Sequence, residues 1–200
     1  MAVIYNTQST STKDLTFCLD AANPSSALVV NYSNPSSWTS AEAAEQKQWG
    51  SVTYGNGKFV AVTYDGAFDA DVANKVMYAS DSDLSTWTAA SAAEANYWNS
   101  VAYGNGKFVA VASSGTNRVM YSSDGINWTS AQATETYSYQ VNHWYGVTYG
   151  NGKFVTVSYA ATISVMYSTN GINWTTANAT YPHNWSSVCY GNGYFVAVAQ

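Results

Sequence analysis

The chain has 200 residues, of which 46% are hydrophobic and only 10% charged, and its formal net charge is −5. This composition provides enough apolar material for one domain with a core, and the shortage of Glu, Lys and Arg favours short strands over long surface helices. A negative chain with a single arginine lacks the clustered cations that phosphates require, so no nucleic-acid partner is expected. The sequence also lacks a long apolar run and a basic, apolar leader, so we expect neither membrane insertion nor a signal peptide.

The first 27 residues, MAVIYNTQSTSTKDLTFCLDAANPSSA, share no pattern with the rest of the chain. We interpret them as an arm that either anchors the molecule to a partner or adds a strand to its fold. The two cysteines, Cys18 in this arm and Cys189 near the other end, match no metal or redox spacing. They can form a disulfide only if the fold brings them together.

A nine-residue segment, YGNGKFVAV or a close variant, occurs four times and is the main sequence signal. Its copies start at Tyr54, Tyr103, Tyr149 and Tyr190, which gives separations of 49, 46 and 41 residues. A tryptophan stands five residues before each copy (Trp49, Trp98, Trp144 and Trp185). Between the copies lies a second element, VMYSSDGINWT or a looser variant, at 76–88, 119–129 and 165–175, with a decayed copy at 29–39; its tryptophans are Trp38, Trp87, Trp128 and Trp174. Such a period is typical of repeated supersecondary units.

Each unit is predicted to form four antiparallel strands, which we call a, b, c and d. Strand a has the pattern W-x-[SG]-V-x-Y, an Asn-Gly hairpin leads to strand b (K-F-V-A-V), and a second turn joins strands c and d. The pattern predicts an all-β fold, a small β-propeller over residues 28–200, with solenoids as the main competitor. The expected blades cover about 49–90, 98–131, 144–177, and 185–200 joined with 28–40.

The last of these blades is expected to close the ring, because the chain starts with strands c and d and finishes with strands a and b. Their pairing would leave no open edge in a four-bladed ring. Four blades make a small ring, so two chains combining, or extra strands from the arm, remain alternatives.

The segment Ser122 to Trp128 (S-S-D-G-I-N-W) resembles the Asp-box, the repeat of bacterial neuraminidases. The resemblance implies a fold-stabilising turn, in which Asp124 binds turn amides and Trp128 packs between strands, and it implies little about activity. The sequence departs from the pattern at Asn170, and also around Asp81 and Asp83, where two residues are inserted. Weaker turns are expected there.

No enzyme signature is recognised, and no catalytic residue, cofactor or metal site is predicted. A sialidase would need an arginine triad for the substrate carboxylate, whereas Arg118 is the only arginine. Glycosidases in general need paired carboxylates, and the cluster Asp65, Asp69 and Asp71 is interpreted as a solvated loop in preference to a calcium or catalytic site. His143 and His183 precede two of the strand-a tryptophans but lack a third ligand with recognisable spacing.

The b–c and d–a loops are expected on one face of the propeller, where they vary in length and composition. They contain seven of the twelve acids (Glu42, Glu45, Asp65, Asp69, Asp71, Glu94 and Glu135), and also Tyr97, Tyr137, Tyr139 and Tyr181. Variable loops on a regular scaffold are a usual place for recognition, and aromatic groups beside polar ones suit sugars. The predicted ligand residues are Tyr97, Tyr137, Tyr139, His143, Tyr181, His183, Asp65, Asp69 and Asp71. The alternative is that these loops are simply unconstrained.

The stretch TKDLTFCLDAANPSS, followed by the YGNGKFVAV and YSSDGINWT repeats, resembles the opening of tailed-phage structural proteins, especially those of cyanophages. The resemblance implies a non-enzymatic virion protein of the tail fibre, tail or capsid decoration, with other virion proteins bound through residues 1–27, host glycan as a further partner and homo-oligomers as a further possibility. A free lectin-like propeller is the alternative function, and a glycan-cleaving enzyme is a distant third.

Overall fold

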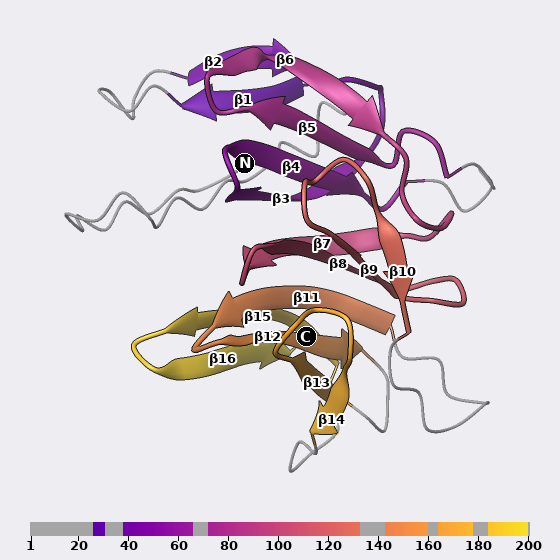
Figure 1. The fold of residues 1–200 in the computed structure, drawn as a ribbon, viewed down its shortest axis with the longest axis vertical. Coiled ribbons are helices and arrows are strands. Elements are labelled where there is room, and N and C mark those ends of the chain that lie inside the picture. Colours follow the sequence, from indigo (N-terminus) through magenta and orange to yellow (C-terminus); the bar gives the residue numbers. More distant parts are fainter. Residues whose placement is uncertain are drawn as a thin grey trace.

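The computed structural model describes residues 26–30, 38–65, 72–132, 143–159, 164–177 and 184–199, with only the backbone of residues 26–30, 38 and 39. These residues form sixteen strands and no helix (Figure 1). The strands are β1 (Ser26–Val30), β2 (Trp38–Glu42), β3 (Trp49–Gly55), β4 (Lys58–Thr63), β5 (Val76–Ser80), β6 (Asp83–Ala90), β7 (Trp98–Gly104), β8 (Lys107–Ala112), β9 (Val119–Ser122), β10 (Thr129–Ala131), β11 (His143–Gly150), β12 (Lys153–Tyr159), β13 (Val165–Ser168), β14 (Thr175–Ala177), β15 (Trp185–Gly191) and β16 (Tyr194–Ala199).

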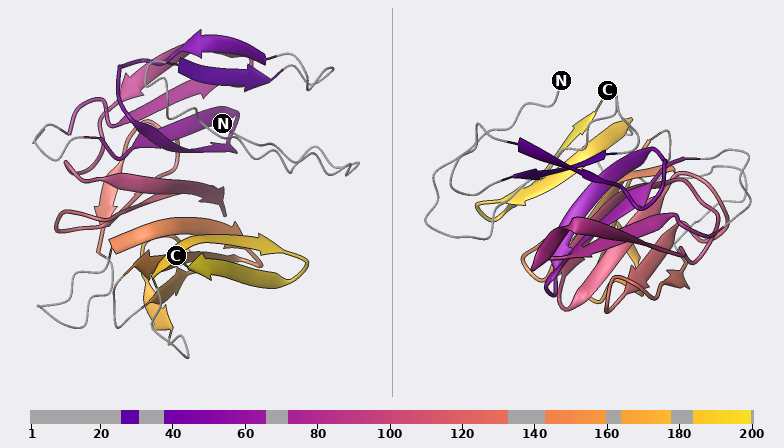
Figure 2. Two further views of the ribbon diagram at one scale, coloured as in Figure 1. Left: turned by 180° about the vertical axis from the view of Figure 1, so that it is seen from behind. Right: turned by 90° about the horizontal axis from the view of Figure 1, so that it is seen from above.

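Three four-stranded antiparallel sheets follow one another along the chain, in the orders β3-β4-β5-β6, β7-β8-β9-β10 and β11-β12-β13-β14. We call them the first, second and third blades. Their first strands are neighbours, β3 beside β7, β7 beside β11, and β11 beside β15, so strand a is the innermost strand of each blade. The views in Figure 2 show the sheets stacked side by side with their faces opposed. The predicted all-β, propeller-like fold is confirmed.

The Asn-Gly hairpins form as the sequence predicts, with positive φ at both turn residues. Asn56 and Gly57 have φ values of 47° and 70°, and Asn105 and Gly106 have 46° and 72°. Asparagine tolerates this left-handed conformation and glycine adopts it without a steric cost, so this dipeptide holds strands a and b in register.

The turn between strands c and d has the hydrogen bonds implied for Asp124. Its Oδ1 accepts bonds from the backbone amides of Ile126 and Asn127, both at 2.8 Å, and from the Ser122 hydroxyl. In the third blade Asn170 Oδ1 accepts the equivalent bonds from the amides of Ile172 and Asn173, at 2.9 Å each. The expected weaker turn at Asn170 therefore keeps the same backbone bonds, but it lacks the charge and the second carboxylate oxygen, to which the Asn127 side chain donates in the Asp124 turn.

Partial burial opposes ionisation of Asp124, but hydrogen bonds from the backbone and side chain of Asn127, and from Ile126 and Ser122, outweigh it. They hold the pKa of the Asp124 carboxyl well below its usual range. The turn is therefore held by an ionised carboxylate over the whole neutral range.

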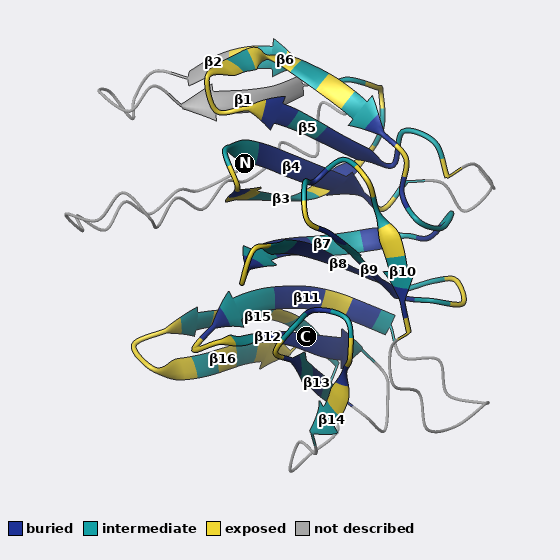
Figure 3. Ribbon diagram, viewed as in Figure 1, coloured by how far each residue is buried: buried dark blue, intermediate teal, exposed yellow. Residues whose placement is uncertain are grey.

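The core lies between successive blades. Val60 and Val62 of β4 face Trp98 and Phe108 of the second blade, in one cluster of buried residues. Val109 and Val111 of β8 face Trp144 and Phe154 of the third blade in the same way. Figure 3 shows this buried interior running through the middle of the stack. Of the repeat tryptophans, Trp49, Trp98, Trp144 and Trp174 are buried, and Trp87, Trp128 and Trp185 are half-buried.

Successive inner strands meet through a tyrosine that covers a glycine of the preceding blade. A β-carbon added to Gly55 would lie 2.0 Å from Cγ of Tyr103, and Gly104 and Gly150 are covered equally closely by Tyr149 and Tyr190. Serine adds a second contact, because Ser51 Oγ accepts a bond from the Val101 amide at 3.1 Å, and Ser100 Oγ accepts one from Val147 at 3.2 Å. We call the tyrosine–glycine contact the Tyr–Gly joint; the chain builds it three times, and the serine bond accompanies the first two, because Gly146 replaces the serine in the third blade.

The expected pairing of the two terminal hairpins is not present among the described strands. β1–β2 and β15–β16 form two separate two-stranded sheets. β2 lies against β6 and β15 against β11, so each hairpin is a half-blade beside its sequence neighbour. The blades do not turn far enough for the two half-blades to meet, and the half-blades lie toward opposite ends of the longest axis (Figure 1).

Candidate ligand-binding face

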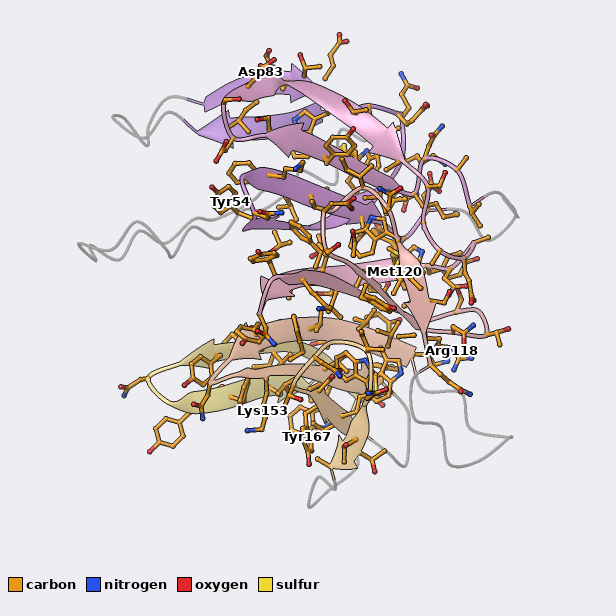
Figure 4. The ribbon with its side chains drawn as sticks, viewed as in Figure 1. Tyr54, Asp83, Arg118, Met120, Lys153 and Tyr167 are labelled. Atoms are coloured by element: carbon orange, nitrogen blue, oxygen red, sulfur yellow. The ribbon has the colours of Figure 1, made fainter. Side chains whose placement is uncertain are left out.

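The b–c and d–a loops lie at the edge of the blades opposite the Asn-Gly hairpins. Figure 4 shows Arg118, which follows a b–c loop, at one side of the stack, and Tyr54 and Lys153, beside the hairpins, at the other. The two sets of loops are thus separated by the length of the strands.

In each of the first two blades, one glutamate forms hydrogen bonds that connect the loops of this face. The backbone carbonyl of Glu94 accepts a bond from the Trp98 indole at 3.1 Å, while its carboxylate binds Asn117 and the Ser130 hydroxyl. Glu45 repeats the pattern, with its carbonyl bound to the Trp49 indole and its carboxylate to the Asn74 amide. These two acids hold one loop to the next, a structural role that counting acids in the loops did not reveal.

Buried cations support the same loops. Lys75 is fully buried, and its ammonium donates a hydrogen bond to the backbone carbonyl of Asp65 at 3.0 Å. Arg118, 6% exposed, occupies the equivalent position in the second blade, directly before the V-M-Y segment. Both residues were missed as structural elements; the sequence signal was their common position before strand c.

Three of the predicted ligand residues are described: His143 and Tyr97 both contact Ser113, whereas Asp65 contacts Lys75 in the first blade. The ring Nδ1 of His143 lies 2.6 Å from the carbonyl of Ser113, across two blades. Tyr97 is half-buried; its carbonyl accepts a bond from the Ser113 amide, and its amide donates to the Ser114 hydroxyl. Asp65 is half-buried beside Lys75. The other six, Tyr137, Tyr139, Tyr181, His183, Asp69 and Asp71, lie outside the described residues.

A different group of residues, two exposed and two half-buried, lies near the starts of strands a. Each strand a has a bulge after its tryptophan, with register shifts at Trp49/Ser51, Trp98/Ser100, Trp144/Gly146 and Trp185/Ser187. In the third blade the bulged residue is Tyr145, which is 40% exposed. A β-bulge inserts one extra residue into a strand, so the direction of that side chain differs from the in-and-out alternation of a regular strand.

Four residues form this group, which we call the aromatic row: Tyr64, Asn99, Tyr145 and Tyr159. The Tyr64 ring is 43% exposed and lies over Gly50. A β-carbon added to Gly50 would lie only 2.8 Å from this ring. The same β-carbon would lie 3.7 Å from the carbonyl of Asn99. Asn99 in turn donates to the carbonyl of Trp144 at 2.9 Å. The rings of Tyr145 and Tyr159 are 5.8 Å apart.

The described residues contain no group of three or more His, Cys, Asp or Glu side chains placed to hold a metal ion. Within the same part of the chain, no helix has the length and apolar character needed to cross a membrane. Cys189 is a free, exposed thiol, and Cys18 falls in a part of the chain without a description.

The repeated blades and the loop face define a class, that of small propeller-like repeat proteins. No known family model matches the chain, and no curated protein does. Among solved structures, YCF48 from Cyanidioschyzon merolae is similar with a TM-score of 0.51 and 13% identity, over 76% of this chain and 49% of that one.

Two other solved structures are similar over much of the chain. YCF48 bound to D1 peptide has a TM-score of 0.45 and 14% identity, over 64% of this chain and 40% of that one. The computationally designed Ika4 protein has a TM-score of 0.49 and 11% identity, over 78% of this chain and 88% of that one. The chain thus spans half or less of the two YCF48 chains, and these likenesses concern the fold alone.

Proposed function

We infer that the chain is a non-enzymatic structural and adhesion module of a tailed-phage virion, which binds host-surface glycan through the aromatic row. The observation that carries this proposal is the pair of exposed tyrosines, Tyr64 and Tyr145. Asn99 links their surroundings, because its carbonyl lies near Gly50 beneath the Tyr64 ring and its side chain bonds the carbonyl of Trp144, the residue before Tyr145. Aromatic rings pack against the C–H faces of sugars, and an amide near them provides both a donor and an acceptor for hydroxyl groups.

The proposal differs from the sequence hypothesis in its residues but not in its face. Tyr64 begins the b–c loop of the first blade and Tyr159 ends strand β12 just before that of the third, so the aromatic row adjoins the variable loops. His143 and Glu94 are used to hold these loops together. The roles of sugar contact and loop support therefore fall on separate residues.

The absence of catalysis is part of the same proposal. Hydrolysis of a glycoside needs two carboxyl groups across the scissile bond. On this face Glu45 and Glu94 have their carboxylates hydrogen-bonded to neighbouring loops. The virion setting is supported by the LDAANP-like opening, which gives residues 1–27 the role of binding other virion proteins.

Binding is tested by a glycan array with the full chain, followed by ligand-observed NMR on the glycans retained. Replacing Tyr145 by Ala should weaken binding about fivefold to tenfold, because one stacked ring is worth about 1 kcal/mol. Tyr167→Ala is the matched control, since Tyr167 lies on strand β13, away from the inner strand β11 that carries Tyr145 (Figure 4). Unchanged affinity in Tyr145→Ala, or no retained glycan, contradicts the adhesion role.

The setting is tested separately with an antibody against the chain. It should label intact phage particles in electron micrographs. Glycan binding without particle labelling would favour the free lectin-like propeller, and release of sugar from a bound glycan would favour the enzyme.

A further inference from the structure

The C-terminal half-blade has an uncovered face that is buried in every other blade. Val196 and Val198 of β16 are 55% and 56% exposed, whereas their equivalents Val60 and Val62 of the first blade are both 0% exposed. The equivalents in the second and third blades are also buried. In the first and second blades this valine face packs against the tryptophan and phenylalanine of the following blade.

The inner strand of the same half-blade carries an unfilled Tyr–Gly joint. Gly55, Gly104 and Gly150 are each covered by a tyrosine of the next blade, but an added β-carbon at Gly191 would meet no atom of the described residues within 4 Å. Toward the other end of the chain, Tyr54 is the repeat equivalent of Tyr103, Tyr149 and Tyr190, but among the described strands it has no strand a of a preceding blade to cover. Its side chain is 49% exposed. Its hydroxyl donates to Asp81 at 2.8 Å, which holds the side chain in place.

The missing strands of each half-blade are those that the other supplies. β16 has no strand c beside it among the described strands, although β4, β8 and β12 each pair with one. β1 and β2 are a c–d hairpin without strands a and b. A sheet edge of this kind offers a row of backbone donors and acceptors to another strand.

We propose that a second copy of this chain occupies this surface, so that β15–β16 of one copy pairs with β1–β2 of the other and Tyr54 covers Gly191. Two such contacts related by a twofold axis close a head-to-tail ring.

The geometry of the joints favours pairing with a second copy over pairing between the two half-blades of one chain. The three joints within the chain all place a tyrosine over a glycine of the preceding blade. After three of them the half-blades still lie toward opposite ends of the longest axis (Figure 1). A fourth joint of the same kind extends the arc, and two copies hold strands for eight blades, within the usual range of about four to eight.

The apolar surface that association would bury belongs mainly to the C-terminal half-blade. On the receiving side Trp49, Ala61 and Met77 are already buried in one chain, with Ala43 and Ala44 beside them. Tyr194, 70% exposed, adds a large aromatic surface next to Val196 and Val198. Contiguous apolar exposure of this kind is typical of an interaction surface.

Gly191→Leu gives a direct test on the full chain. In one copy the leucine meets open space, and Gly191 does not have the left-handed backbone that would disfavour a side chain. In the proposed ring the leucine would collide with Tyr54. The wild type should therefore have twice the mass of the 21.5 kDa chain in sedimentation equilibrium, and the variant should have the mass of one chain.

Thr129→Leu, on an exposed position of the outer strand β10, is the matched control and should remain a dimer. If Gly191→Leu fails to fold, Val196→Lys provides the same test at an exposed position. A monomeric wild type, including one closed on itself, overturns the proposal, and so does a dimer that persists in both variants.

Discussion

The ring of Tyr149 covers Gly104 so closely that an added β-carbon would lie 2.0 Å from the tyrosine Cγ. We predict that Gly104→Ala lowers the free energy of unfolding by at least about 1–3 kcal/mol, since overpacking forces side chains and backbone to shift. Urea denaturation measures this. Tyr149→Ser should rescue part of the loss when the two changes are combined, because it removes the colliding ring. Equal losses with and without the ring would contradict the contact.

Local signals predicted the blades, because they depend on short stretches of sequence. Asn56-Gly57 specifies its hairpin through positive φ, and Asp124 specifies its turn through hydrogen bonds to nearby amides. The aromatic row was missed because strict alternation does not reveal the bulge that exposes Tyr145. Glu94 was grouped with the loop acids because its partner Asn117 is distant in sequence. The angle between blades depends on packing across each joint, which the repeat count does not specify.

The lowered pKa of Asp124 predicts that its turn loses stability in acid. Its folded-state pKa is depressed, so its contribution to stability is present above the unfolded pKa of about 3.9 and is lost as the pH falls through the folded value. Asp124→Asn copies the natural Asn170 turn and does not titrate. We expect the wild type to be the more stable at pH 7 and the difference to shrink below pH 4. Urea midpoints across this range measure it; a constant difference down to pH 2 would show that the charge is irrelevant.

The burial of Lys75 and its bond to Asp65 predict that the first b–c loop requires a cationic side chain beneath it. Lys75→Ala leaves the Asp65 carbonyl without this donor and should cost about 1–3 kcal/mol of unfolding free energy. Lys75→Arg places there the residue that the second blade uses at Arg118, and it should retain most of the stability. Thermal and urea denaturation of both variants test this. Equal losses in the two variants would mean that packing, not the cation, matters at this position.

Asn105 combines two roles that substitutions can separate. Its backbone has a φ of 46°, and its side-chain amide donates to the Thr169 carbonyl of the third blade at 3.1 Å. Asn105→Gly keeps the turn conformation and removes only the bond between blades, whereas Asn105→Ala also places an unfavourable side chain at positive φ. We expect the alanine variant to be less stable than the glycine variant by about 1 kcal/mol. Urea denaturation of the pair decides the matter: if the two are equally stable, the bond to Thr169 accounts for the whole effect and the turn conformation for none of it.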